Sequence, residues 1–261
     1  MIDLEPDTPK RKAAGNEKRT LLLFAAVGGG IVIVGLVVVL ILSLTTGVPG
    51  NTPNTPGGPD DSKPPLAQKC PPPTKKPPQG DVPEDSGGQR TVDTESGISY
   101  KAYGSPWRNW DQGDWNQGEL HIKYIAGQYF VTETYSEGDY LASILSGHVP
   151  AAVNDGTDLD LKCVSQQVVA DVRKSYYPQP NKFKSLRDEA ATLGGRPAWV
   201  REFEVRFHQD GLTATNERVG VALIDVGRKD AAVLYVSIPG THKQYDKVVN
   251  EVLDSVRPTH K

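Results

Sequence analysis

One uninterrupted run without charge, LLLFAAVGGGIVIVGLVVVLILSL, occupies residues 21–44 of this chain of 261 residues. At a rise of about 1.5 Å per residue it forms a helix of about 36 Å, and the hydrocarbon core of a bilayer is about 30 Å thick. A helix satisfies its own backbone hydrogen bonds in lipid, where no water is available to do so. We therefore expect residues 21–44 to form a single transmembrane helix that contacts the lipid bilayer.

Basic residues flank this run on its N-terminal side only: Lys10, Arg11, Lys12, Lys18 and Arg19 precede it, and none follows until Lys63. Positive charge beside a membrane segment stays cytoplasmic. We expect a single-pass protein of the cell membrane, with residues 1–20 as a cytoplasmic tail and the remainder outside. The alternative, a cleaved signal peptide, has an apolar region of about 7–15 residues and a small-residue cleavage site, which LSLTTGVPG does not offer.

Residues 45–92 form a proline-rich stretch that holds 12 of the 21 prolines and shows no hydrophobic periodicity. Such a segment buries too little apolar surface to offset the entropy of ordering, so we expect a disordered extracytoplasmic linker. The remaining residues, 93–261, are long enough for one stable domain. They carry 19 basic and 23 acidic side chains. Because no basic cluster is present, we do not expect nucleic acid as a partner.

The outer domain alternates between sheet and helix patterns. GELHIKYIAGQYFVTETYS predicts two strands around AGQ, with Leu120, Ile122 and Tyr124 on one face. GDYLASILSGHV places Leu141, Ile144, Leu145 and His148 on one side of a short helix. A second helix is expected from about Asp160 to Tyr176, before Pro178. Its buried face is marked at helical spacing by Leu161, Val164, Val168 and Val172.

The rest of the domain predicts three strands and a closing helix. GGRPAWVREFEVRFH alternates as a half-buried strand, ERVGVALIDV is a further strand, and AAVLYVSI is apolar on both faces and hence central. THKQYDKVVNEVLDSVRP carries an apolar stripe at helical spacing. We expect an α+β domain in which helices flank an antiparallel sheet.

The two cysteines lie in different parts of the chain, Cys70 in the linker and Cys163 in the predicted helix. The outer side of a membrane is oxidising, which favours a Cys70–Cys163 disulfide. An intermolecular bridge or two free thiols are the alternatives. No metal site is expected, because no Cys-x-x-Cys or Cys/His spacing is present and the acidic stretch NDGTDLDLK lacks the pattern of a calcium loop.

Three of the four tryptophans fall within nine positions, in SPWRNWDQGDWNQG at residues 105–118. Tryptophan beside Asp and Asn can stack on sugar rings or anchor a protein partner, and it can equally seal a core. We expect Trp107 in the core and Trp115 as the most exposed of the three. The candidate ligand or partner contacts are Trp110, Trp115, Asp114 and Asn116.

Two segments of the outer domain resemble PsbP-like domains. GISYKAYGSPWRNW is similar to the opening of that family, and TLGGRPAWVREFEVRF is similar to one of its strands. The strand pair followed by an amphipathic helix also resembles its ending. The resemblance implies an α/β/α sandwich used for binding, without a shared catalytic site. Secreted actinobacterial lipoproteins of the LpqN/LpqT type are similar in style, but this chain has an anchor helix and no lipid-accepting cysteine.

No catalytic motif is recognisable: G-x-S-x-G, H-E-x-x-H, the P-loop and the dinucleotide-binding glycines are all missing from the sequence. We expect a non-enzymatic, membrane-anchored extracytoplasmic protein of the bacterial cell envelope that binds an envelope protein or a glycan without a cofactor. An envelope hydrolase with an unrecognised site, or a regulatory or sensory membrane protein, are the alternatives.

Overall fold

A computed structural model describes residues 63–73, 79–82, 87–150, 153 and 159–259 of the chain. The chain divides into two units, Met1–Gly58 and Pro59–Lys261, and every described residue belongs to the second. The predicted tail and transmembrane helix, residues 1–20 and 21–44, lie outside the described residues and stay predictions. Within the described part, no helix has both the length and the apolar character needed to cross a bilayer.

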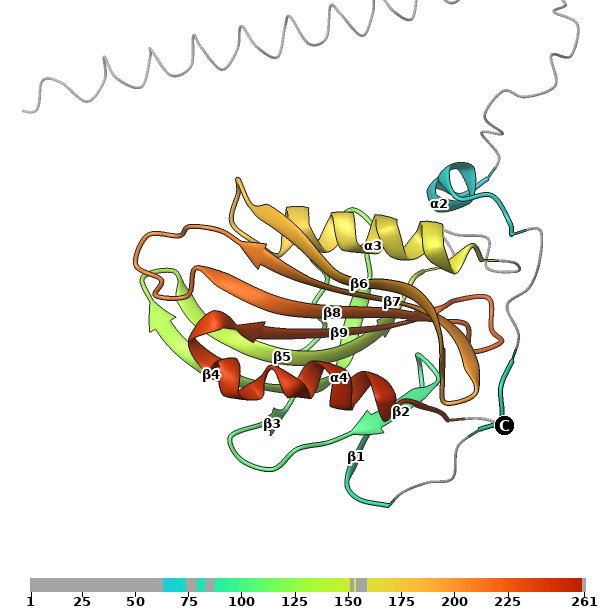
Figure 1. Ribbon diagram of the computed structural model, residues 1–261, viewed down its shortest axis with the longest axis horizontal. Coiled ribbons are helices and arrows are strands. Elements are labelled where there is room, and N and C mark those ends of the chain that lie inside the picture. Colours follow the sequence, from blue (N-terminus) through green and yellow to red (C-terminus); the bar gives the residue numbers. More distant parts are fainter. Residues whose placement is uncertain (1–62, 74–78, 83–86, 151–152, 154–158, 260–261) are drawn as a thin grey trace, which may run out of the picture. The chain divides into compact units, whose positions relative to one another are not determined.

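A seven-stranded antiparallel sheet forms the centre of the second unit, with the strand order β3-β4-β5-β9-β8-β7-β6 (Figure 1). A smaller sheet has the order β1-β2-β10. The strands of the large sheet are β3 (Arg108–Asn109), β4 (Lys123–Tyr135), β5 (Gly138–His148), β6 (Lys182–Leu193), β7 (Arg196–Arg206), β8 (Asn216–Ile224) and β9 (Ala232–Pro239). Those of the small sheet are β1 (Arg90–Asp93), β2 (Ile98–Lys101) and β10 (Arg257–Pro258).

Helices cover both faces of the large sheet, as Figure 1 shows. Helix α3 (Leu161–Ser175) packs on one face, and the 3₁₀ helix η1 (Gly240–Tyr245) and helix α4 (Lys247–Asp254) lie on the other. At Gly220 in β8 a Cβ atom would come within 2.6 Å of Val249 Cγ1, so glycine is needed for α4 to approach the sheet. The expected α+β arrangement of helices around an antiparallel sheet is confirmed.

Most of the expected elements are present. Helix α3 carries the predicted buried stripe of Leu161, Val164, Val168 and Val172. Strands β7, β8 and β9 occupy the predicted segments, and every residue of the central strand β9 is buried. The closing helix is also present, with η1 forming its first part.

The helix predicted in GDYLASILSGHV is wrong, because this segment is strand β5. It pairs with β4 on one side and β9 on the other. Ile144 faces the α4 layer and Leu145 faces the α3 layer, and both are buried. A strand covered on both faces loses its apolar–polar alternation and is easily mistaken for a helix.

The two strands predicted around AGQ are also wrong, since β4 is one continuous strand with a register shift between Tyr124 and Ala126. Gly127 has φ +155° and lies so close to β5 that a Cβ atom would be 2.1 Å from the Ile144 carbonyl oxygen. The glycine that suggested a turn therefore permits close approach of two strands. Edge strand β6 is not predicted, because its residues are mostly exposed and highly charged.

The disordered linker expected over residues 45–92 needs correction at its C-terminal end. Residues Pro65–Lys69 form the short helix α2, whose Leu66 is buried in the α3-side core and donates its backbone N–H to the Val153 carbonyl. Strand β1 begins at Arg90, before the expected domain start at residue 93. A proline-rich sequence with few apolar side chains thus still contributes an anchor residue to the domain.

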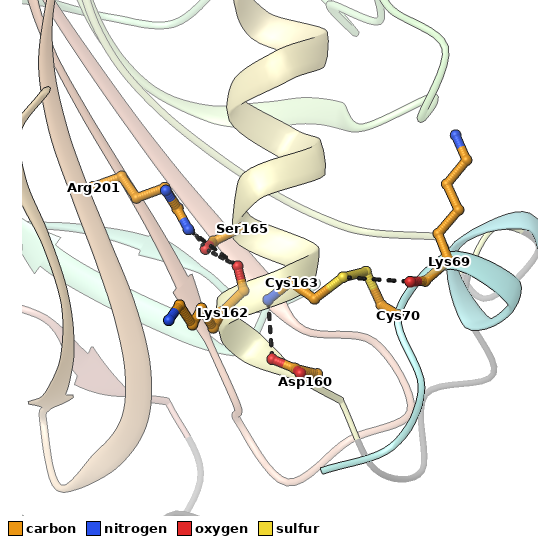
Figure 2. Close-up of a disulfide and its surroundings, with 7 residues drawn as sticks. All are labelled: Lys69, Cys70, Asp160, Lys162, Cys163, Ser165 and Arg201. Atoms are coloured by element: carbon orange, nitrogen blue, oxygen red, sulfur yellow. Dashed lines mark hydrogen bonds between the residues drawn. A yellow bond between two sulfur atoms is a disulfide. The ribbon is translucent and has the colours of Figure 1, made fainter. Parts of the chain in front are cut away.

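The Cys70–Cys163 disulfide is confirmed and fixes this segment to α3 (Figure 2). The two Cα atoms are 5.5 Å apart, within the usual range for a disulfide. Asp160 caps the helix, since its side chain accepts a hydrogen bond from the Cys163 amide at 2.9 Å. The carboxylate caps the helix and the disulfide ties the preceding chain to its first turn.

Because the disulfide joins residues 93 positions apart, its loss should destabilise the domain through the entropy of the unfolded chain. We expect Cys70→Ser, Cys163→Ser and the double variant each to lower the free energy of unfolding by about 2–4 kcal/mol in urea denaturation. Reduction of the native chain should give the same loss and leave the double variant unchanged. Equal stabilities of the oxidised and reduced native chain would contradict this.

Candidate functional site

The tryptophan-rich segment is fixed along strand β4. Strand β3 pairs with β4, the Trp110 amide donates to the Gly127 carbonyl at 2.9 Å, and Trp115 exchanges two backbone hydrogen bonds with Tyr124. The Trp110 indole N–H donates to the Gly113 carbonyl at 2.7 Å. These bonds hold both indoles against the α3-side core.

A carboxylate on α3 secures the end of this segment. Asp171, buried in α3, accepts hydrogen bonds from the backbone amides of Glu119 and Leu120 at 2.8 and 3.0 Å. Gly118 has φ +144°, and a Cβ atom there would lie 2.4 Å from an Asp171 carboxylate oxygen. Only glycine fits at this position, because any side chain would collide with the Asp171 carboxylate that binds the next two amides.

The indole side chains occupy different places from one another. Trp107 is in the core as expected, 6% exposed, with its ring edge-on to Phe130. Like Trp110, Trp115 is half-buried and is more exposed than Trp107. Its ring lies 4.4 Å from that of Tyr176 and 5.5 Å from that of Tyr124, centroid to centroid.

A cavity of about 350 Å³ lies on the α3 face of the sheet, where strands β5, β8 and β9 meet the segment that follows α3. The helix of 15 residues is about 22 Å long, whereas β4 and β5 extend for about 36–44 Å, so α3 leaves part of the sheet uncovered. Half of the lining residues are aromatic: Trp110, Trp115, Tyr135, Tyr140, Tyr176, Tyr177 and Tyr235. We call this space the aromatic cavity.

Of the four predicted contact residues, the structure brings Trp110 and Trp115 to the wall of the aromatic cavity. Asp114 and Asn116 are exposed and do not line it. Asp114 instead forms an ion pair with Lys123 at 2.5 Å. Whether any of the four contacts a ligand stays a prediction.

Glu217 of strand β8 is the buried carboxylate of the aromatic cavity, with only 2% of its surface exposed. The Tyr177 hydroxyl donates to Oε2 at 2.7 Å, and the Tyr140 hydroxyl donates to Oε1. Burial raises the pKa of Glu217 from 4.5 to about 7, although hydrogen bonds from Tyr140, Tyr177 and Ser237 act in the opposite direction. Around neutral pH this carboxyl group therefore exists in both protonation states.

The tyrosine hydroxyls around Glu217 form a connected group. Tyr177 Oη lies 2.8 Å from Tyr235 Oη. Burial, and after it the nearby Glu217 charge, raises the pKa of Tyr140, Tyr177 and Tyr235. These phenols stay protonated at neutral pH and serve as hydrogen-bond donors to the carboxylate.

The sequence alone did not identify Glu217 or the tyrosines of this cavity. They come from β4, β5, β8, β9 and the segment after α3, and no motif spacing joins them. The adjacent pair Tyr176–Tyr177 at the C-terminal end of a predicted helix was the one local signal. Glu217 was the first residue of the predicted strand ERVGVALIDV, and glutamate is mostly found at exposed positions, so nothing in the sequence indicated its burial.

A second cavity, of about 380 Å³, lies beside the disulfide between α3 and the β6–β7 edge. Trp199 forms part of its wall, with the Lys162 ammonium 5.4 Å from the Trp199 ring centroid and the indole N–H donating to Asp188. No buried charged group lines it in the part of the chain described. Across the described ranges, no group of three or more His, Cys, Asp or Glu side chains is placed to hold a metal ion.

The chain is similar to solved structures of other proteins. No protein-family model matches the chain, and no curated protein does. A solved structure, the solution structure of cyanobacterial PsbP (CyanoP) from Synechocystis sp. PCC 6803, is similar over 65% of this chain and 91% of that chain, with 15% sequence identity and a TM-score of 0.39. The resemblance to lipoproteins of the LpqN/LpqT type stays a prediction.

The raised pKa of Glu217 makes the stability of the domain depend on pH. The folded state binds the Glu217 proton more tightly than the unfolded state, so its contribution is complete below about pH 4.5 and is lost as the pH rises through about 7. Relative to the native chain, Glu217→Gln should therefore gain up to about 3 kcal/mol in free energy of unfolding between pH 4.5 and pH 8.

Urea denaturation at both pH values measures this gain. Glu204→Gln, on the neighbouring strand β7, removes the same charge from a side chain that is 24% exposed and controls for the loss of one carboxylate. A difference between native chain and Glu217→Gln that stays constant from pH 4.5 to pH 8 would contradict the raised pKa.

Proposed function

We propose that this chain is a single-pass membrane protein of the bacterial envelope that displays a non-catalytic binding domain on the outer side. Residues 21–44 anchor it, and the proline-rich stretch up to about residue 62 separates the domain from the bilayer. The Cys70–Cys163 disulfide supports an oxidising location for the domain. The N-terminal basic residues and the uncharged run support the orientation.

The observation that carries the binding role is the aromatic cavity. Small-molecule sites are concave, mainly apolar and aromatic, and contain a few converging polar groups. The aromatic cavity has this composition, with Glu217 and Ser237 as buried polar groups and Asp139 and Gln117 as exposed lining residues at its opening. Its volume of about 350 Å³ is at the small end of the usual range of about 300–1,000 Å³.

An envelope hydrolase is the second candidate, and one observation favours it. A carboxyl group with a pKa of about 7 can act as a general acid or base at neutral pH. Asp139 supplies a second carboxylate to the same cavity. Against this role, the described lining contains no histidine or cysteine that would activate or serve as a nucleophile.

Equilibrium dialysis of the purified full chain against a small-molecule extract of bacterial envelopes, followed by mass spectrometry, tests the binding function. We expect the native chain to retain a small molecule and Trp115→Ala to lose it. Trp199→Ala is the matched control, because Trp199 is also half-buried against the α3-side core but lines the other cavity. Recovery of the molecule unchanged supports binding, and recovery of a cleavage product supports the hydrolase.

The orientation is tested on intact cells that carry the same chain. Added protease should remove the domain and leave an N-terminal fragment in the membrane. An intact chain after this treatment, or retention of the same molecules by the native chain and Trp115→Ala, would contradict the proposed function.

A further inference from the structure

Two glutamates are buried on neighbouring strands of the sheet, but their partners differ in charge. Glu202 of β7 is 3% exposed and forms ion pairs with Arg218 at 2.9 Å and Arg187 at 3.6 Å. Glu217 of β8 is 2% exposed and receives hydrogen bonds only from neutral hydroxyls among the described residues. Buried carboxylates are normally paired with a cation, so Glu217 lacks the counter-ion that Glu202 has.

The aromatic cavity also lacks positive charge. None of its described lining residues is Lys, Arg or His, whereas two of them, Glu217 and Asp139, are acidic. Lysines on the adjoining segments have acidic partners of their own: Lys123 pairs with Asp114, and Lys174 pairs with Glu119. The cavity is therefore electrostatically suited to a cation and unsuited to an anion.

The aromatic rings add to this preference. The face of an aromatic ring carries negative potential and attracts ammonium groups, and tryptophan and tyrosine are the strongest rings in this respect. Trp110, Trp115 and Tyr176 are half-buried lining residues, so their rings remain partly accessible to a ligand. Aromatic walls with a buried carboxylate at one end are the arrangement that recognises quaternary and protonated amines.

We propose that the aromatic cavity binds an organic cation with an ammonium head group, for which Glu217 supplies the missing counter-charge. This inference rests on the proposed binding function and specifies its ligand class. The small volume accommodates an amine head group rather than a long chain. A neutral sugar, which could also stack on the tryptophans, is the competing ligand and is distinguished by the test.

The groups that face Glu217 determine how binding depends on pH. Tyr140 approaches from β5, Tyr177 from the segment after α3, and Tyr235 and Ser237 from β9. Asp139 of β5 lines the same cavity, and its carboxylate accepts a hydrogen bond from the Thr134 hydroxyl at 2.6 Å. On its other side β8 pairs with β7, whose Val205 is opposite Glu217. Because the pKa of the phenols is raised, Glu217 is the group whose charge changes near neutral pH. Cation binding should strengthen as the pH rises from 6 to 8.

Titration of the full chain with choline, monitored by tryptophan fluorescence, tests the ligand class. The neutral isostere 3,3-dimethylbutan-1-ol has the same shape without the charge. We expect choline to bind at least tenfold more tightly than the isostere at pH 8. Glu217→Gln should weaken choline at least tenfold and leave the isostere unchanged, while Glu204→Gln, whose carboxylate pairs with Arg206, should bind choline as the native chain does.

The outcomes separate the ligand class from the binding function. Equal binding of choline and the isostere, no binding of choline, or undiminished choline binding by Glu217→Gln would overturn the cation proposal. If Trp115-dependent retention of a neutral envelope molecule is still observed, the binding function stands and only the ligand class is wrong. If no molecule is retained either, both are wrong. Unfolding curves of each variant at pH 8 verify that binding is compared between folded chains.

Discussion

The structure depends most on how it accommodates one buried carboxylate. Glu217 is withdrawn from water without a basic side chain beside it in the described part of the chain, a costly arrangement unless hydroxyl donors surround the oxygens. Tyr140 and Tyr177 meet this need and are thereby oriented with their hydroxyls toward β8. Their rings then form part of the wall of the aromatic cavity.

The rest of the fold keeps that space open. Helix α3 ends well before the strands beneath it, and Tyr176 and Tyr177 follow its last turn. The tryptophan-rich segment lies over the part of the sheet that α3 does not reach. Hydrogen bonds to β4 and to Asp171 fix its position there. At the other end of α3, the disulfide fixes the helix to the preceding chain (Figure 2). Leu66 of that chain is buried in the same core. The N-terminal end of α3 is thus attached to the preceding chain, and its C-terminal end borders the aromatic cavity.

The sequence revealed the parts of this fold that depend on local patterns. The apolar stripe on α3 and the apolar strand β9 were predicted, because a hydrophobic pattern is visible within a single segment. The disulfide was predicted from the oxidising compartment expected for the domain. Strand β5 was mistaken for a helix since burial on both faces hides alternation, and Gly127 suggested a turn where it permits strand packing. Of the cavity lining, the sequence singled out Trp110 and Trp115, because tryptophan is rare in the chain. Glu217 was not recognised, because its partners are tyrosines that the fold brings from distant positions.

The central claim is that Glu217 is buried, titrates near neutral pH and supplies the counter-charge for a cation bound in the aromatic cavity. The most direct measurement is the carboxyl carbon resonance of Glu217, assigned with Glu217→Gln, followed by NMR from pH 4 to pH 9 with and without saturating choline. The account predicts a midpoint of about 7 for the free chain, lowered by choline. A midpoint near the ordinary glutamate value of 4.5, unchanged by choline, would contradict it.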